Sequence, residues 1–206
     1  MGIWDKFVVL EGLDGSGTTT QLDKLVAHCQ ENGIPCYRTF EPSDGFIGRA
    51  CRDVLEKRET AETLTLAQLF AADRREHLKQ IRSKLEEGCW VFCDRYLFSS
   101  LAYQSLNIDF ETVLDLNKDY PAPGSCFYVE CSVETSAARR GGRDSVDLYE
   151  KEALQRKVAQ NYEKAFAAFY PSDTEKSINP SGQLYRIDGE SSVEDVFDSI
   201  RSILKL

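Results

Sequence analysis

Short apolar runs alternate along the chain with longer segments in which apolar residues recur every three or four positions. The runs are 7–10, 35–40, 90–93, 127–129 and 184–187. Short continuous apolar runs separated by helical segments are typical of strands buried on both faces of a parallel sheet. The pattern predicts a doubly wound α/β fold, a five-stranded parallel sheet flanked by helices, and leaves the order of the strands open.

Five helices are predicted between and after these strands. Two of them end at Gly33 and Gly88, and two others begin at Ser132 and Ser192, whose hydroxyls can cap a helix N-terminus. The five segments are the one carrying Leu22, Leu25, Val26 and Cys29, then 66–85, the segment after Ser132, 150–170 and the segment after Ser192. The segments 41–46, 140–148 and 171–183 are expected to be loops. Because there is no internal repeat or linker, we expect a single domain over 1–206.

Composition narrows the range of partners. The chain has 206 residues and a net charge of −9, which argues against binding to a nucleic-acid polymer or a membrane surface but not to a small anion. No apolar run approaches the roughly 18 residues of a membrane span. Seven cysteines without a C-x-x-C pair favour buried thiols in a reducing cytoplasm, and two histidines leave little for a zinc site or a Ser-His-Asp triad. The predicted location is therefore cytoplasmic.

A glycine-rich segment lies between the first predicted strand and the first predicted helix, the position of a phosphate-binding loop. Gly12 and Gly17 have the spacing of the two glycines in G-x-x-x-x-G-K-[ST], and Thr19 occupies the hydroxyl position that binds Mg²⁺. Glycines let backbone N–H groups converge on phosphate oxygens, and the helix N-terminus adds partial positive charge. The candidate ATP-binding residues are Gly12, Asp14, Gly15, Ser16, Gly17, Thr18, Thr19 and Thr20.

Thr18 occupies the position where this motif has a lysine. That lysine contacts the β- and γ-phosphates, and its loss removes about 4 kcal/mol of Coulomb attraction at an effective dielectric constant near 20. Taken alone, the segment is therefore equally compatible with a glycine-rich turn that binds no ligand.

Asp94 and Arg95 directly follow the third predicted strand. Open α/β sheets bind ligands at the carboxyl ends of their strands. The planar guanidinium of Arg95 suits an acceptor phosphate or the phosphoryl group in transfer, and Asp94 can hold Mg²⁺ through water. A simple Asp–Arg surface pair is the alternative.

Three arginines, Arg139, Arg140 and Arg143, lie in a segment with two glycines after the fourth predicted strand and its helix. A mobile basic loop can close over donor phosphates and expel water. The alternative is a solvated helix C-terminus, where arginines interact favourably with the helix dipole. Because the phosphate loop has no basic residue, we expect one of these arginines to replace the missing lysine charge, with a lid over about 139–149.

Five ordered segments resemble those of bacterial thymidylate kinases, P-loop nucleoside-monophosphate kinases. They are the phosphate loop with Asp14, then Phe40-Glu41-Pro42, then 69–77 with Phe70 and Arg74, then Asp94-Arg95-Tyr96 followed by 99–104, and finally Asp147-Leu148-Tyr149-Glu150. The resemblance spans residues 6 to about 165 and implies the family branch whose catalytic arginines come from the lid. Leu148 departs from the arginine that many bacterial members have at this position.

The resemblance implies the reaction ATP + dTMP → ADP + dTDP, in dTTP biosynthesis, with Mg²⁺ and in a homodimer. It implies that Phe70 stacks on thymine, that Arg74 donates to a base carbonyl and that Tyr103 packs against the deoxyribose. Asp14 would accept from the 3′-hydroxyl, and Ser100 and Gln104 would bind the thymine edge. The candidate substrate-binding set is Asp14, Phe40, Glu41, Pro42, Phe70, Arg74, Arg95, Ser99, Ser100, Tyr103, Gln104, Asp147, Tyr149 and Glu150; the catalytic set is Arg95, Arg139, Arg140 and Arg143; and the metal set is Thr19 and Asp94.

Two other functions stay open at this stage. One is a kinase of another nucleotide or nucleoside, and the other is a nucleotide-binding regulator that lost turnover with the lysine. A GTPase is the least favoured alternative, because the segment Asn117-Lys118-Asp119-Tyr120 lacks the aspartate at the fourth position of N-K-x-D.

Overall fold

The fold is a parallel sheet of five strands in the order β2-β3-β1-β4-β5. The computed structural model describes residues 3–141, 145–171 and 182–206. The strands are β1 (Phe7–Gly12), β2 (Cys36–Phe40), β3 (Trp90–Asp94), β4 (Ser125–Glu130) and β5 (Gln183–Asp188). The parallel α/β prediction is confirmed, and all five predicted strands are present.

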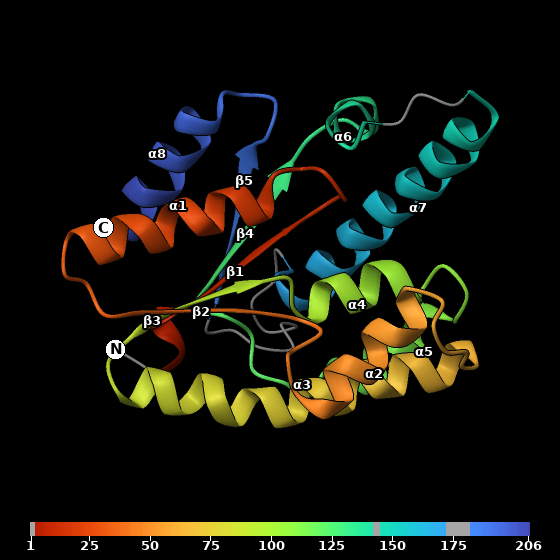
Figure 1. Cartoon of the computed structure of the whole chain (residues 1–206), viewed down its shortest axis with the longest axis horizontal. Coiled ribbons are helices and arrows are strands. Elements are labelled where there is room, and N and C mark those ends of the chain that lie inside the picture. The colour runs from red at the N-terminus through yellow and green to blue at the C-terminus, as the bar shows by residue number, and fades with distance from the viewer. Residues whose placement is uncertain (1–2, 142–144, 172–181) are drawn as a thin grey trace.

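Helices cover both faces of the sheet (Figure 1). The chain forms the 3₁₀ turn η1 (Ile3–Lys6) and the helices α1 (Thr18–Glu31), α2 (Phe46–Leu55), α3 (Thr63–Glu86), α4 (Leu97–Gln104), α5 (Phe110–Asn117), α6 (Val133–Arg139), α7 (Ser145–Phe169) and α8 (Val193–Leu204). One face packs against α1 and α8, and the other packs against α3, α4, α5 and α7. The sheet is therefore the middle layer of three.

The apolar run of β1 is continuous because both faces of this strand are buried. Phe7 and Val9 belong to the core on the α3 side, whereas Val8 and Leu10 belong to the core on the α1 side. All four side chains are fully buried, because successive side chains of a strand point to opposite faces and both faces are covered. β1 is the central strand of the sheet. Its carboxyl end and the loop that follows lie at the edge of the sheet where the candidate site is found.

Several expectations about helices need correction. Helix α7 begins at Ser145, so the prediction that 145–148 belong to a loop is wrong. Helices α2, α4 and α5 were not predicted, because they have only eight to ten residues and too few turns to establish a period. In α2, Gly48 also lowers helix propensity; it is required there because a Cβ would lie 1.9 Å from the carbonyl oxygen of Ser43.

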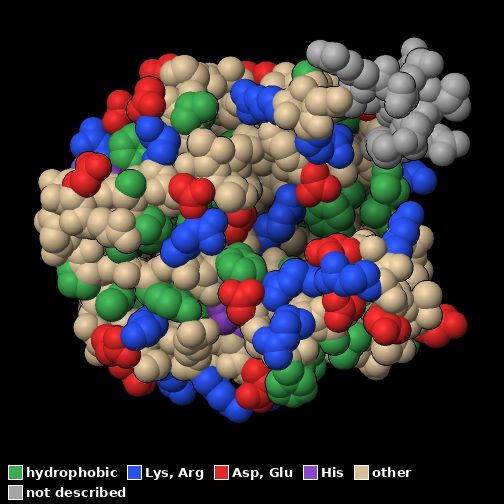
Figure 2. All heavy atoms as spheres, viewed as in Figure 1, with side chains coloured by type: hydrophobic (Ala, Val, Ile, Leu, Met, Phe, Trp, Pro, Cys, Tyr) green, Lys and Arg blue, Asp and Glu red, His purple; other side chains and the backbone are tan. Residues whose placement is uncertain are grey.

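The predicted N-caps are confirmed. Ser132 accepts a hydrogen bond from the backbone N–H of Thr135, and Ser192 accepts one from Asp195. None of the helices in the described part of the chain combines the length and apolar character needed to cross a membrane. Lys/Arg and Asp/Glu side chains are interspersed over the face in Figure 2, consistent with local binding of small anions rather than a broad positive field.

Candidate active site

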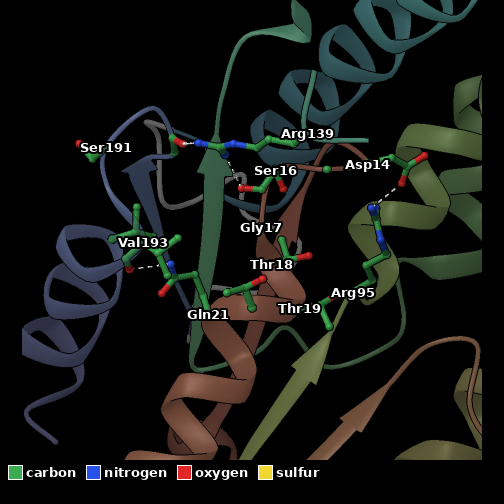
Figure 3. Close-up of a pocket in the computed structure, with 14 residues that line it drawn as sticks. Asp14, Ser16, Gly17, Thr18, Thr19, Gln21, Arg95, Arg139, Ser191 and Val193 are labelled. Atoms are coloured by element: carbon green, nitrogen blue, oxygen red, sulfur yellow. Dashed lines mark hydrogen bonds and ion pairs between the residues drawn. The ribbon is translucent and has the colours of Figure 1, made fainter. Parts of the chain in front are cut away.

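A cavity of about 640 Å³ lies at the carboxyl end of the sheet, around the loop that joins β1 to α1. Figure 3 shows this loop between Arg139 on one side and the Asp14–Arg95 pair on the other. The lining residues are Asp14, Gly15, Ser16, Gly17, Thr18, Thr19, Thr20, Gln21, Arg95, Arg139, Gly189, Ser191, Val193 and Val196. The cavity therefore brings together seven of the eight candidate ATP-binding residues, two arginines and the segment between β5 and α8.

The phosphate loop requires glycine at two positions. Gly15 and Gly17 have φ values of 90° and 101°, in the left-handed region that other residues rarely adopt. A Cβ on Gly15 would also lie 2.5 Å from the carbonyl oxygen of Ser136, so the loop packs directly against α6. Gly17 precedes α1 without a side-chain cap, which leaves the first N–H groups of that helix available to an anion.

Among the residues that line this cavity, the positively charged side chains are those of Arg95 and Arg139. The Arg139 guanidinium donates to the carbonyl oxygens of Ser16 at 3.2 Å and Gly189 at 2.9 Å, as Figure 3 shows. Thr18 is 5% exposed and lines the same space. Arg140 donates instead to Ser136 of its own helix and is not among the lining residues, while Arg143 lies outside the described residues.

Thr19 and Asp94 meet at the floor of the site. The Thr19 hydroxyl donates to Asp94 Oδ2 at 2.5 Å, and Asp94 Oδ1 is buried without a partner among the described residues. An unpaired buried carboxylate oxygen beside a hydroxyl fits a hard cation such as Mg²⁺, which prefers oxygen ligands and keeps several waters. The described residues hold no cluster of three His, Cys, Asp or Glu side chains that could bind a metal alone, so substrate phosphates and water would complete the coordination.

A second pocket of about 250 Å³ adjoins the first. Its lining residues are Asp14, Glu41, Pro42, Leu55, Phe70, Arg74, Arg95, Tyr96, Ser99, Ser100, Tyr103 and Gln104. The hydroxyl of Tyr103 and Oε1 of Gln104 are buried and have no hydrogen-bond partner among the described residues. Since buried polar atoms are normally paired, these two atoms are suited to contact polar groups of a ligand.

Arg95 and Asp14 line both pockets and join them. The Arg95 guanidinium donates to Asp14 Oδ1 at 2.7 Å and to the carbonyl oxygen of Gly12 at 3.0 Å. It also donates to the hydroxyls of Ser99 and Tyr162, each at 3.2 Å. The Arg95 backbone has φ 69°, a costly conformation for a non-glycine residue that the surrounding contacts must hold.

Arg74 lies in a buried polar network behind the second pocket. It is 1% exposed, and its Nε donates to Glu41 Oε2 at 2.9 Å. Other N–H groups donate to Ser100 Oγ at 2.9 Å and to Asn117 Oδ1. The guanidinium also stacks over the rings of Tyr96 and Tyr120. In this arrangement Arg74 holds Glu41 and Ser100 at the pocket wall, while its donation to a base carbonyl stays a prediction.

Four predicted site residues are not found in these two pockets: one lies elsewhere, and the side chains of the other three are not among those that the structure describes. Phe40 lines a separate hollow beside Tyr37 and packs against the guanidinium of Arg52. The Asp147, Tyr149 and Glu150 side chains lie outside the described residues. Gly12 contributes through its carbonyl oxygen, which accepts from Arg95, and a Cβ there would meet Ser16 Oγ at 2.3 Å.

Sequence reasoning missed several residues of the two pockets. They are Gln21, Leu55, Tyr96, Gly189, Ser191, Val193 and Val196. Tyr96 follows Arg95 directly and could have been found from that motif. Gln21 directly follows the candidate set 12–20 on α1, whereas the others come from elements distant in sequence and no local pattern marks them.

A phosphate loop after the first strand, an adjoining smaller pocket and an arginine shared between them define the P-loop nucleoside-monophosphate kinases, which are phosphotransferases. A family model described as thymidylate kinase matches residues 10–200. The chain belongs to the thymidylate kinase family.

Similar proteins cover most of the chain. A probable thymidylate kinase of Methanococcus aeolicus is 42% identical over 159 residues, 77% of this chain and 78% of that protein. A probable thymidylate kinase of Pyrococcus abyssi is 36% identical over 207 residues, and a thymidylate kinase of Caldicellulosiruptor saccharolyticus is 32% identical over 209. Each of these two alignments covers 97% of this chain and 95% of the other protein.

Replacing Arg74 tests the buried network. We expect Arg74→Ala to lower the free energy of unfolding by about 3–5 kcal/mol, because it leaves the Glu41 carboxylate buried without its cation. Arg75 follows on the same helix, is exposed and contacts the Tyr120 ring, so Arg75→Ala should cost less than about 1 kcal/mol. Urea denaturation of the two variants measures the difference; equal losses would contradict this account of Arg74.

Proposed function

We propose that this enzyme transfers the γ-phosphoryl group of ATP to dTMP, giving ADP and dTDP, with Mg²⁺ as cofactor. The observation that carries the proposal is the adjoining pair of pockets that share Arg95 and Asp14. The larger pocket, with the phosphate loop, suits the triphosphate. The smaller pocket, with an aromatic side chain and unpaired polar atoms, suits a nucleoside monophosphate.

Several side chains of the smaller pocket fit a deoxypyrimidine nucleotide. In this proposal Phe70 stacks on the base, Ser100 and Gln104 bind its edge, and Tyr103 packs where a ribose would carry its 2′-hydroxyl. Because Ser100 Oγ accepts from Arg74, the Ser100 hydroxyl proton is available to donate to the ligand. Asp14, next to Arg95, would accept from the 3′-hydroxyl.

Phosphoryl transfer here needs no general base. The attacking phosphate oxygen of the acceptor is already ionised near neutral pH, since the second pKa of a phosphate monoester is about 6. Arg95 lines both pockets and would lie between the acceptor phosphate and the phosphoryl group in transfer, since a guanidinium can bridge two oxyanions. Mg²⁺, when bound, neutralises charge on the donor phosphates, and the chain would hold it through Asp94 and Thr19.

A binding protein without turnover is the rival function. The half-buried arginine that links the two pockets favours an enzyme, because a side chain shared by two adjoining pockets suits transfer between two ligands, whereas binding of a single nucleotide needs only one pocket.

An ADP-release assay with ATP–Mg²⁺ tests the reaction. We expect turnover with dTMP at a higher kcat/KM than with the ribonucleotide of thymine, because Tyr103 would pack where a ribose carries its 2′-hydroxyl. We also expect a higher kcat/KM than with dUMP or dCMP, because Phe70, Ser100 and Gln104 would contact the thymine base. Binding of dTMP without turnover of any monophosphate would contradict the kinase and favour the regulator.

We further propose that Arg139 supplies the charge that Thr18 cannot, within a lid over about 139–149 of a single domain spanning 1–206. Its guanidinium already lies against the loop at Ser16, whereas Arg140 bonds to its own helix. Arg143 could join it when the lid closes. The loop amides, Arg95 and Arg139 would then neutralise the donor phosphates together.

Single substitutions in the lid test this assignment. We expect Arg139→Ala to lower kcat by about 10³-fold, within the range typical of arginines that act on a phosphoryl group. Arg140→Ala is the matched control and should cause a much smaller loss. Equal losses, or an unchanged kcat in Arg139→Ala, would contradict the role of Arg139.

We also propose that the enzyme is a cytoplasmic homodimer. Exposed apolar side chains lie at both ends of α2 and at the start of α3: Phe46 is 72% exposed, Leu55 52% and Leu64 44%. Sedimentation velocity should give about twice the chain mass of 23.3 kDa, and Phe46→Glu should shift the protein toward monomer. A monomer at every accessible concentration would contradict the proposal.

A further inference from the structure

Glu11 is a fully buried carboxyl group at the end of β1, one residue before the phosphate loop begins at Gly12. The proposed reaction gives it no role, and it lines neither pocket. Burial raises the pKa of Glu11 to about 7, although hydrogen bonds from Ser99, Tyr162 and the Tyr96 backbone and the charge of Arg95 lower it. A carboxyl group that titrates near neutral pH is unusual for a structural position.

The carboxylate is surrounded by donors. Ser99 Oγ lies 2.6 Å and Tyr162 Oη 3.0 Å from Glu11 Oε2. The backbone N–H groups of Tyr96 and Ser99 donate to Oε1 at 2.8 and 3.3 Å. An ionised carboxylate only accepts and is a stronger acceptor than a neutral oxygen, so in this state it draws the protons of both hydroxyls toward Glu11.

The same two hydroxyls hold Arg95. One terminal nitrogen of the Arg95 guanidinium donates to Ser99 Oγ and to Tyr162 Oη, each at 3.2 Å. A hydroxyl whose proton goes to Glu11 has its lone pairs free to accept from Arg95. The carbonyl oxygen of Gly12, 3.2 Å from Tyr162 Oη, and Ser99 Oγ, 2.9 Å from it, are the competing acceptors for the tyrosine proton. Glu11 thereby decides which way the two hydroxyls turn.

We propose that Glu11 is a positioning residue for Arg95: its carboxylate orients the hydroxyls of Ser99 and Tyr162 so that the guanidinium stays between the two pockets. This inference rests on the proposed kinase function. It adds to that function a connection between β1, which precedes the phosphate loop, and Arg95, which lines both pockets.

The positioning of Arg95 by Glu11 should depend on pH, because it requires the carboxylate form of Glu11. A protonated Glu11 donates to one of the hydroxyls, which then turns its own proton elsewhere and has fewer lone pairs left to accept from Arg95, so the guanidinium is held less firmly. The titratable and charged groups facing Glu11 are Arg95, Tyr96, Tyr162, Tyr170, Cys93 and Cys126. Burial raises the pKa of each of the three tyrosines and two cysteines above its ordinary value, and Arg95 stays charged. Glu11 is therefore the group in this set that changes charge between pH 6 and 8.

The test compares kcat/KM for dTMP in the unmodified enzyme and in Glu11→Gln from pH 6 to 9. The ionisation of the dTMP phosphate affects both enzymes equally and cancels in the ratio of the two values. We expect the ratio to rise as pH increases through 7 and to level off at tenfold or more. A ratio that does not change with pH would overturn the inference, because a merely structural role predicts a constant loss.

A pair of tyrosine variants keeps the test decisive if Glu11→Gln does not fold. Tyr162→Phe removes one of the hydroxyls between Glu11 and Arg95 and should lower kcat at least several-fold. Tyr170→Phe makes the same change at a buried hydroxyl without a partner among the described residues, and should leave kcat unchanged. Equal kcat in the two variants would overturn the inference. An unmodified enzyme that does not turn over dTMP would overturn the proposed function as well.

Discussion

The proposed reaction depends on placing positive charge between two phosphate groups in a protein of net charge −9 whose phosphate loop has no lysine. Backbone N–H groups at the start of α1 supply part of that charge. In the proposed reaction guanidinium groups supply the rest: Arg95 lines both pockets, and Arg139 donates to the phosphate loop at Ser16. The positive charge is therefore local, which is why an overall acidic chain can bind nucleotides.

The half-buried Arg95 and the buried Arg74 have different surroundings. Arg95 is bound to Asp14, a carbonyl oxygen and two hydroxyls, and it lines both pockets. Arg74 is bound to Glu41 and Asn117 and lies under two tyrosine rings, so it fixes the pocket wall. A buried charge is tolerated only with such partners, because desolvation alone would be prohibitive. Each arginine thus requires its own set of acceptors from distant elements.

The sequence predicted the parts of the fold that local patterns encode. Five apolar runs became five parallel strands, Ser132 and Ser192 became N-caps, and the phosphate loop and Arg95 lie at the carboxyl ends of their strands. Strand order and the short helices α2, α4 and α5 could not be predicted, because they depend on packing. The role proposed for Glu11 could not be predicted for a similar reason, because its hydrogen-bond partners Ser99 and Tyr162 lie 88 and 151 residues away in the sequence.

The central claim is that arginine side chains replace the missing lysine, and a double-mutant cycle between Thr18→Lys and Arg139→Ala tests it most directly. If Arg139 supplies the absent charge, Thr18→Lys adds little to the unmodified enzyme but restores much of the kcat lost in Arg139→Ala. The coupling free energy should then be about 1–3 kcal/mol. Effects of the two substitutions that add to within about 0.5 kcal/mol would contradict the account.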